Sequence, residues 1–296
     1  MRRQLTLGAL VVLAGLTVAV AQQQAPLPPL PELTKVKDNL YVIAGSTPGP
    51  AFTGGNIGVL VTDTGVVLVD TKLPGYGRDI LANIRKVTDK PVTMVINTHT
   101  HRDHTGSNEA FPATIDFVAQ ENTKANMMKM DAFKGDKAQF LPKRTYKDKM
   151  SLGSGKNRID LFYFGPGHTN GDSWVLYPSL RVLQTGDLFA RRDAPIIDRN
   201  NGGSGIEFPK TIAKAIAAIK DIDTVIPGHS PVTTPKDLQE YQRFLTEWVG
   251  AVEAAAKAGK SVDEAVSSIN LAARYPGYTS ENYKNAIAAV YAELGK

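Results

Sequence analysis

The chain has 296 residues and no cysteine, with 42% hydrophobic and 21% charged residues; this composition is ordinary for a globular protein and excludes collagen-like, disordered and multi-pass membrane proteins. Without cysteine there are no disulfides, thiolate metal ligands, cysteine nucleophiles or lipoprotein anchors. The formal net charge of +5 is too small to predict a nucleic-acid partner.

Residues 1–21 have the pattern of a secretory signal peptide. Two arginines at positions 2–3 precede an apolar run, residues 5–20, and an Ala-Val-Ala sequence ends at position 21, as before a cleavage site. The alternative is an uncleaved membrane anchor, but the run is short for a membrane span. We therefore expect a periplasmic or secreted protein with no stable membrane anchor. Residues 22–34 are rich in Gln and Pro and predict an extended linker.

The next part of the chain predicts a first β-rich half. Short apolar runs indicate strands, and an Asp-Thr-Gly turn at positions 63–65 joins two of them into a hairpin. Apolar residues at positions 80, 81 and 84 have helical spacing. The predicted elements are strands at 40–44, 56–61, 66–70 and 91–97, and a helix at 76–87.

A second half repeats this order, with strands followed by a helix and a last strand. The helix carries apolar residues on one face, from Ile212 to Ile219. Two similar halves predict an internally duplicated α/β sandwich over residues 35–234, with helices outside two sheets. The predicted elements are strands at 160–164, 174–177, 181–184 and 223–226, and a helix at 206–222.

Residues 235–296 predict a helical C-terminal extension. Thr234 is a suitable N-cap and Pro235 suits the first helical position, while apolar residues then recur at helical spacing. Ser261 and Glu264 form a capping box for another helix. We expect this extension to pack onto the sandwich; the alternative is an interface with a second subunit. The sequence does not define the oligomeric state.

Three of the five histidines lie in one segment directly after the predicted strand 91–97. They are His99, His101 and His104, with Asp103 between the last two. In an extended backbone alternate side chains point the same way, so His99, His101 and Asp103 can share one side while His104 diverges toward a second centre. Because a divalent cation removes the cost of burying such a group of imidazoles and carboxylates, the segment predicts a metal site.

The other two histidines and one aspartate also lie at strand ends. His168 and His229 each follow an apolar strand and a Pro-Gly turn, and Asp187 follows an apolar strand and a glycine. A lone histidine in a loop is usually structural or exposed. The shared context, in a chain without further histidines, predicts both as metal ligands and makes Asp187 a candidate bridging carboxylate.

This set of residues, in this order, resembles the metallo-β-lactamase superfamily over roughly residues 36–231. The resemblance implies an αβ/βα four-layer sandwich with two metal ions at the strand ends between the sheets. It also implies the ligands: His99, His101 and His168 for the first metal, Asp103, His104 and His229 for the second, and Asp187 as a bridge between them.

The same resemblance implies a metal-dependent hydrolase. The nitrogen and oxygen ligands suit two Zn²⁺ per chain and are also compatible with Fe or Mn. A histidine at position 101, where redox di-iron relatives carry glutamate, favours hydrolytic zinc. Two cations would convert a bridging water to hydroxide near neutral pH, and the hydroxide would attack a carbonyl. Asp103 is the candidate catalytic residue, as the general acid that carries the proton to the leaving group.

The small-molecule substrate stays open. Relatives cleave β-lactams, thioesters, lactones, sulfate esters and phosphodiesters. Asp187 favours an ester, lactone, thioester or amide hydrolase, because the antibiotic-hydrolysing branches usually carry cysteine or serine there. Export favours the alternative, a β-lactamase. A redox iron protein and a non-catalytic metal-binding module are further alternatives. Residues 191–205 are either an ordinary surface loop or a substrate wall, in which Arg191 or Arg192 would hold an anionic group.

Overall fold

The structure is a computed structural model in which residues 26–296 are described. The predicted signal peptide and residues 22–25 of the predicted linker lie outside the described residues. The rest of the linker contacts the body, because Tyr76 Oη donates to the Pro28 carbonyl over 2.9 Å and Leu30 packs against an apolar cluster. Strand β1 begins at Leu33, so the chain joins the first sheet two residues before the predicted boundary at residue 35.

The first sheet has seven strands in sequence order. Strands β1 to β4 pair antiparallel and β4 to β7 pair parallel. The strands are β1 (Leu33–Lys37), β2 (Leu40–Ile43), β3 (Ile57–Val61), β4 (Val66–Val69), β5 (Val92–Ile96), β6 (Asp116–Gln120) and β7 (Arg144–Tyr146).

The second sheet has five strands in the order β12-β11-β10-β9-β8. All its neighbours are antiparallel except β11 and β12, which are parallel. Strands β9, β11 and β12 therefore run in the same direction, and their carboxyl ends meet at one edge. The strands are β8 (Lys149–Leu152), β9 (Ile159–Phe162), β10 (Trp174–Tyr177), β11 (Val182–Gly186) and β12 (Thr224–Pro227).

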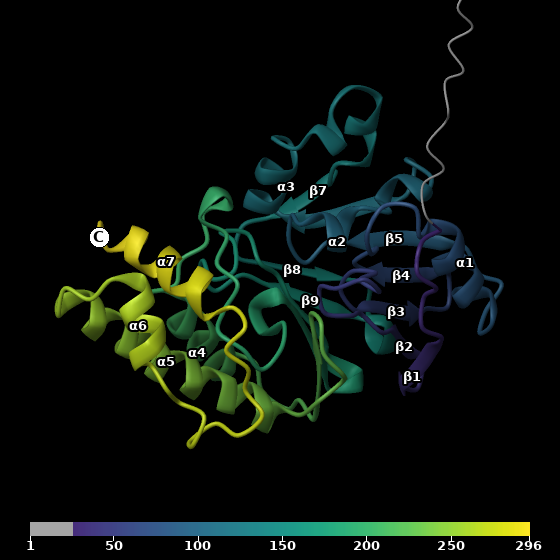
Figure 1. The fold of residues 1–296 in the computed structure, drawn as a ribbon. Coiled ribbons are helices and arrows are strands. Elements are labelled where there is room, and N and C mark those ends of the chain that lie inside the picture. The colour runs from purple at the N-terminus through teal and green to yellow at the C-terminus, as the bar shows by residue number, and fades with distance from the viewer. Residues whose placement is uncertain (1–25) are drawn as a thin grey trace, which may run out of the picture.

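Three apolar clusters show that the sheets and helices form four layers. One cluster fills the space between the sheets, with Val69 and Ile96 from the first and Leu161 and Val175 from the second. A second joins the outer face of the first sheet to helix α1 (Gly77–Arg85). The third joins the outer face of the second sheet to the later helices. The predicted αβ/βα sandwich is confirmed, and Figure 1 shows the helices on its two outer sides.

The C-terminal helices pack onto the second sheet, as the sequence led us to expect. Trp248 and Leu245 of α5 are fully buried in the same cluster as Trp174 of β10, and α5, α6 and α7 lie together at this side of the molecule (Figure 1). Both predicted caps are present as capping boxes. The remaining helices are α2 (Arg102–Thr105), α3 (Glu121–Met127), α4 (Phe208–Ala218), α5 (Pro235–Lys257), α6 (Val262–Ser268) and α7 (Tyr283–Glu293).

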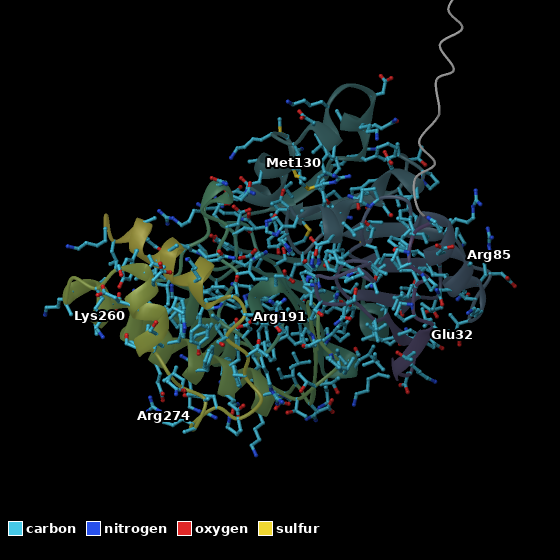
Figure 2. All side chains as sticks on the ribbon, viewed as in Figure 1. Glu32, Arg85, Met130, Arg191, Lys260 and Arg274 are labelled. Atoms are coloured by element: carbon cyan, nitrogen blue, oxygen red, sulfur yellow. The ribbon has the colours of Figure 1, made fainter. Side chains whose placement is uncertain are left out.

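Charged side chains are distributed over the outside of this architecture. In Figure 2, Glu32, Arg85, Lys260 and Arg274 project from the periphery, whereas Arg191 lies near the middle of the view. In the part of the chain that the structure describes, no helix combines the length and the apolar character that crossing a bilayer requires.

Candidate metal centre

The seven predicted ligand residues come together at one end of the sandwich. The segment after β5 supplies His99, His101, Asp103 and His104, the last two on the short helix α2. The second sheet supplies the others from the carboxyl ends of its three like-directed strands. They are His168 after β9, Asp187 directly after β11, and His229 after β12. The centre therefore draws on loops of both sheets.

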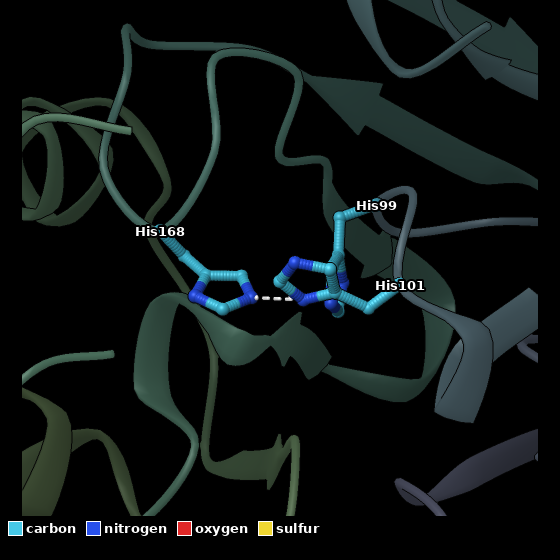
Figure 3. A group of neighbouring side chains, drawn as sticks. All are labelled: His99, His101 and His168. Carbon is cyan, nitrogen blue, oxygen red and sulfur yellow. Dashed lines mark hydrogen bonds between the residues drawn. The ribbon is translucent and has the colours of Figure 1, made fainter. Parts of the chain in front are cut away.

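A first group is made of imidazoles alone. Ligand atoms of His99, His101 and His168 lie within 4.8 Å of one another. His168 reaches His101 from a separate loop, with 2.8 Å between His168 Nε2 and His101 Nδ1, and Figure 3 shows the three rings converging. His99 Nε2 is buried and has no hydrogen-bond partner among the described residues. Three converging ring nitrogens, one of them orphaned, fit a divalent cation.

A second group mixes imidazoles and a carboxylate. Ligand atoms of Asp103, His104 and His229 also lie within 4.8 Å of one another. His104 Nε2 is 3.1 Å from His229 Nε2, and His229 Nε2 is 3.2 Å from Asp103 Oδ2. This donor set is again nitrogen and oxygen, and it fits a second divalent cation.

Asp187 lies between the two groups. Its Oδ1 is 3.3 Å from both His104 Nε2 and His229 Nε2, and its Oδ2 is 3.6 Å from His168 Nε2. Its Oδ1 is also buried without a hydrogen-bond partner in the described chain. One carboxylate that faces both groups is placed as the predicted bridge requires.

Each imidazole turns its other ring nitrogen to a protein acceptor. His101 Nε2 donates to Asp198 Oδ2 over 2.7 Å, and His104 Nδ1 donates to Asp70 Oδ2 over 2.8 Å. The rings after β9 and β12 donate to backbone carbonyls, and that of His99 to a hydroxyl; the acceptors are Ile196 O for His168, Ser46 O for His229 and Thr98 Oγ1 for His99. These bonds fix the tautomers so that every centre-facing nitrogen can present a lone pair.

The segment 190–205, which we call the collar, supplies several of these contacts. The His229 amide donates to Ala190 O over 2.9 Å, and Ile196 and Asp198 hold His168 and His101. The collar therefore supports three of the five histidines through hydrogen bonds, and whether it also contacts a substrate stays a prediction. Arg192 pairs with Asp237 of α5, and Arg191 Nη2 lies 3.4 Å from Asp193. Arg191 Nε and Nη1 are buried without a hydrogen-bond partner among the described residues.

Two glycines leave room for the ligands. A Cβ on Gly55 would lie 2.1 Å from His104 Cε1, and a Cβ on Gly228 would lie 2.0 Å from Asp187 Oδ1. Real Cβ contacts are not that short, so any side chain at either position would displace a ligand residue. The backbone is thus shaped around His104 and Asp187.

Asp70 is a positioning residue that the sequence analysis missed. It follows β4 with φ of 69°, a left-handed conformation that is costly for a residue other than glycine. Its carboxylate accepts from the amide and the hydroxyl of Thr98, at 2.8 and 2.7 Å, as well as from His104. The signal was available, because Asp70 ends an apolar strand just as Asp187 does.

Replacing Asp70 tests how much this support contributes. We expect Asp70→Asn to weaken metal binding at the second group by roughly 10- to 100-fold, the usual loss for such outer partners, because the amide cannot accept from Thr98 and His104 with both atoms. Stepwise Zn²⁺ titration of metal-free protein measures this. The exposed Asp79→Asn is the matched control, and equal affinities in both variants would contradict the role of Asp70.

Charge differs sharply between the two groups. Burial, with the charges of His104 and His168, holds the pKa of His99 well below its usual value. Burial and the charge of His101 lower the pKa of His168 to about 4. Burial also lowers the pKa of His101, but the hydrogen bond to Asp198 and nearby carboxylates outweigh it and raise the pKa. The first group thus carries at most one proton at neutral pH.

When its histidines are protonated, the second group consists of imidazolium and carboxylate ion pairs. Burial opposes charge throughout, yet the carboxylates Asp103 and Asp187 raise the pKa of His104 well above its usual value. Asp187 and hydrogen bonds raise that of His229 to about 9. In turn, against their own burial, the histidines lower the pKa of Asp103 to about 2 and hold that of Asp187 well below its usual value.

These shifts predict a different pH dependence for the two metal ions. A cation must displace the protons of His104 and His229 at the second group, but only that of His101 at the first. Between pH 6 and 8 we therefore expect the association constant for a cation to rise more steeply with pH at the second group than at the first. Both slopes flatten above the raised pKa values. Metal titrations across this range measure the slopes, and equal slopes would refute the assignment.

Lys72 is a second residue that sequence analysis did not find. It is fully buried and its Nζ donates to Ala44 O. Burial lowers its pKa to about 7, although the charges of Asp103 and Asp70 oppose this. A pKa of about 7 leaves Lys72 about half protonated at neutral pH, and its ammonium form offsets part of the negative charge of Asp103 and Asp70.

A cleft of about 690 Å³ opens beside the second group. The ring of Phe52, in the loop between β2 and β3, stacks on His229 with 5.8 Å between centroids. The volume is typical of small-molecule sites. The cleft runs between the first sheet's edge and the loop after β12, and its lining includes Lys35, Gly45, Asn56, His229, Ser230 and Thr233.

Comparisons with known protein families agree with this geometry. The family model of the metallo-beta-lactamase superfamily matches residues 50–229, well over half of the chain. The matched range contains all seven residues of the centre and ends at His229.

Individual relatives are distant. The metallo-beta-lactamase type 2 of Elizabethkingia meningoseptica is 27% identical over 250 residues, covering 81% of this chain and 94% of that enzyme. The type 2 enzyme of Bacillus sp. strain 170 is 27% identical over 176 residues, which span 66% of its length. The 2,4-dinitroanisole O-demethylase subunit alpha of Nocardioides sp. strain JS1661 is 30% identical over 128 residues, 42% of this chain and 38% of that subunit.

Solved structures share the fold. The metallo-beta-lactamase from Pontibacter korlensis matches with a TM-score of 0.64 at 21% identity, over 73% of this chain and 99% of that one. The DIM-1 metallo-beta-lactamase matches with a TM-score of 0.60 at 22% identity, over 74% of this chain and 99% of that one. About a quarter of this chain is thus additional to each of them.

Proposed function

The chain belongs to the metallo-beta-lactamase superfamily, and from that premise we propose that it is a hydrolase that holds two Zn²⁺ and cleaves a carbonyl substrate with water. The family and the histidine and aspartate cluster support a metal-dependent hydrolase. The observation that carries the proposal is the pair of ligand groups joined by Asp187. Zinc suits the borderline nitrogen and oxygen donors, and a histidine at position 101 favours it over iron.

Most residues of the centre would hold the cations, and Asp103 would transfer a proton. When bound, the cations would supply Lewis acidity and lower the pKa of a coordinated water. Asp103 is the more open carboxylate, because its side chain is 19% exposed and that of Asp187 only 4%. Asp103 is ionised at neutral pH, because its pKa is lowered to about 2, and its carboxylate could accept a proton from a water whose own pKa the cations had lowered. It then returns that proton to the leaving oxygen, nitrogen or sulfur atom as the bond to the carbonyl carbon breaks.

The proposed substrates are esters, lactones, thioesters or amides of small molecules. The cleft beside His229 supports a small ligand, and its lining is mixed, with hydroxyl-bearing, apolar and charged side chains. A carboxylate at position 187 separates this chain from the antibiotic-hydrolysing branches that the sequence analysis described. We further propose that the protein works in the periplasm or outside the cell, from the signal-peptide pattern at residues 1–21.

A β-lactamase remains the second candidate, because a relative named metallo-beta-lactamase type 2 aligns over 81% of this chain. Another relative is named as an O-demethylase subunit, so membership in this family does not by itself define the substrate.

Metal analysis and a substrate panel test the proposal. Purified protein should contain about two zinc ions per chain and no visible iron absorption, and a chelator should abolish its hydrolytic activity. The panel comprises nitrocefin, a lactone, a thioester, a phosphodiester and 2,4-dinitroanisole. Turnover of the lactone or thioester supports the proposal, whereas turnover of nitrocefin alone selects the second candidate. A protein that binds no metal, or that turns over none of these compounds, would overturn it.

A further inference from the structure

The C-terminal segment 279–293, which ends with α7, is bonded to the collar at several points. The Thr279 amide donates to Arg192 O over 3.0 Å, and Asn282 Nδ2 donates to Pro195 O over 2.7 Å. Glu293 accepts from Ser204 Oγ, and from the Gly205 amide over 2.9 Å. The segment therefore contacts the collar near its beginning, middle and end.

Among these residues, Glu293 has the most partners in the collar. Its side chain is only 15% exposed, and its carboxylate also lies 3.5 Å from Arg199 Nη1. A mostly covered carboxylate that accepts two hydrogen bonds and faces a guanidinium is costly to leave unpartnered. The last turn of α7 (yellow in Figure 1) thus holds the carboxyl-terminal part of the collar in place.

The same part of the collar holds the first ligand group through Asp198. The Asp198 carboxylate accepts from His101 Nε2 and from Asn201 Nδ2, at 2.7 and 2.6 Å. Its amide donates to His168 O over 2.9 Å, and its carbonyl accepts from the Gly203 amide over 2.8 Å. Asp198 is therefore bonded to both His101 and His168. Ser204 and Gly205, which directly follow its partner Gly203, are bonded to Glu293.

We propose that the segment 279–293 is a positioning element of the metal centre, with Glu293 acting through Asp198 on His101. The inference rests on the proposed function, because it assigns a role toward the first metal. The segment lies outside residues 50–229, the range that the family model matches, so this chain supplies from its extension a support that the matched region does not contain.

Cobalt binding to full-length, metal-free protein tests the inference. A His229→Ala background disables the second group, so the Co²⁺ absorption spectrum reports the group His99, His101 and His168. In that background we expect Asp198→Asn to raise the Kd for Co²⁺ roughly 10- to 100-fold. Glu293→Ala should raise it roughly 2- to 30-fold, and Glu293→Gln by less. The matched control is Glu253→Ala, an exposed residue of α5 outside this segment that should leave the Kd unchanged.

A double variant separates this role from a merely structural one. If Glu293 acts through Asp198, adding Glu293→Ala to Asp198→Asn should weaken Co²⁺ binding no further. Hydrogen exchange of the metal-free protein should also be faster at residues 196–203 in Glu293→Ala than in Glu253→Ala. Additive effects on the Kd, or a Kd in Glu293→Ala equal to that of the control, would overturn the inference.

The remaining outcomes are also decisive. Should Glu293→Ala fail to fold, Glu293→Gln and Asn282→Ala carry the same comparison, and an unchanged Kd in both would overturn the inference. Failure of the inference alone appears as normal Co²⁺ binding that ignores Glu293. Failure of the proposed function appears as no Co²⁺ binding in the wild-type chain, and it would remove both.

Discussion

Asp187→Ala should lose both a full metal complement and nearly all hydrolytic activity. Asp187 is the carboxylate that faces both ligand groups, within 3.3 Å of His104 and His229 and 3.6 Å of His168. Removing it leaves the cations without their shared counter-charge. The Lewis acidity of such a centre contributes several kcal/mol to the transition state, so we expect kcat to fall by at least about 10³-fold.

Metal content by elemental analysis and turnover of the substrate found in the panel measure this effect. The exposed Asp38→Ala serves as control and should keep about two metal ions per chain. The assignment of Asp187 as the bridge would be wrong if the alanine variant retained wild-type metal content and turnover.

Gly55→Ala should also inactivate the protein, although it adds a single methyl group. That Cβ would lie 2.1 Å from His104 Cε1 and 2.6 Å from its Nε2, so the imidazole must move. His104 Nδ1 donates a hydrogen bond to Asp70. The imidazole can therefore move little without breaking this hydrogen bond. A displacement of about 1 Å at a reacting centre costs on the order of 10²-fold in rate, and we expect at least that loss in kcat/KM.

Gly49→Ala provides a matched control in the same loop, because a Cβ there meets nothing within 4 Å. It should leave metal binding and turnover unchanged. Thermal unfolding of both variants shows whether the loss is local. Full activity in a folded Gly55→Ala variant would refute the close approach of this backbone to His104.

The convergence of the seven candidate ligand residues could be predicted from the sequence because each lies after an apolar strand. Strands β5, β9, β11 and β12 bring their carboxyl ends to one end of the sandwich, and the order of the residues along the chain supplied the rest. The tail was also predictable, since Thr234 and Ser261 carry local capping signals that the structure contains.

The partners of these residues could not be predicted in the same way. Asp198 contacts His101 across 97 positions of the chain, and no local pattern marks such a contact. Strands β7 and β8 were missed because they are short and of mixed polarity. Strand β7, for example, is Arg144–Tyr146, with only Tyr146 buried. Strand β1 is an edge strand without a fully buried residue, so it does not show the alternation that identifies a strand.

Because loops of both sheets supply the centre, it forms only in the folded chain, and this affects the stability of the protein. A cation held there binds only the folded chain, so it adds to the free energy of unfolding. At a free metal concentration a hundred times the Kd this gain is about 2.7 kcal/mol. Metal starvation would then shorten the half-life of the molecule against proteases, and supply of the ion would regulate its abundance as well as its chemistry.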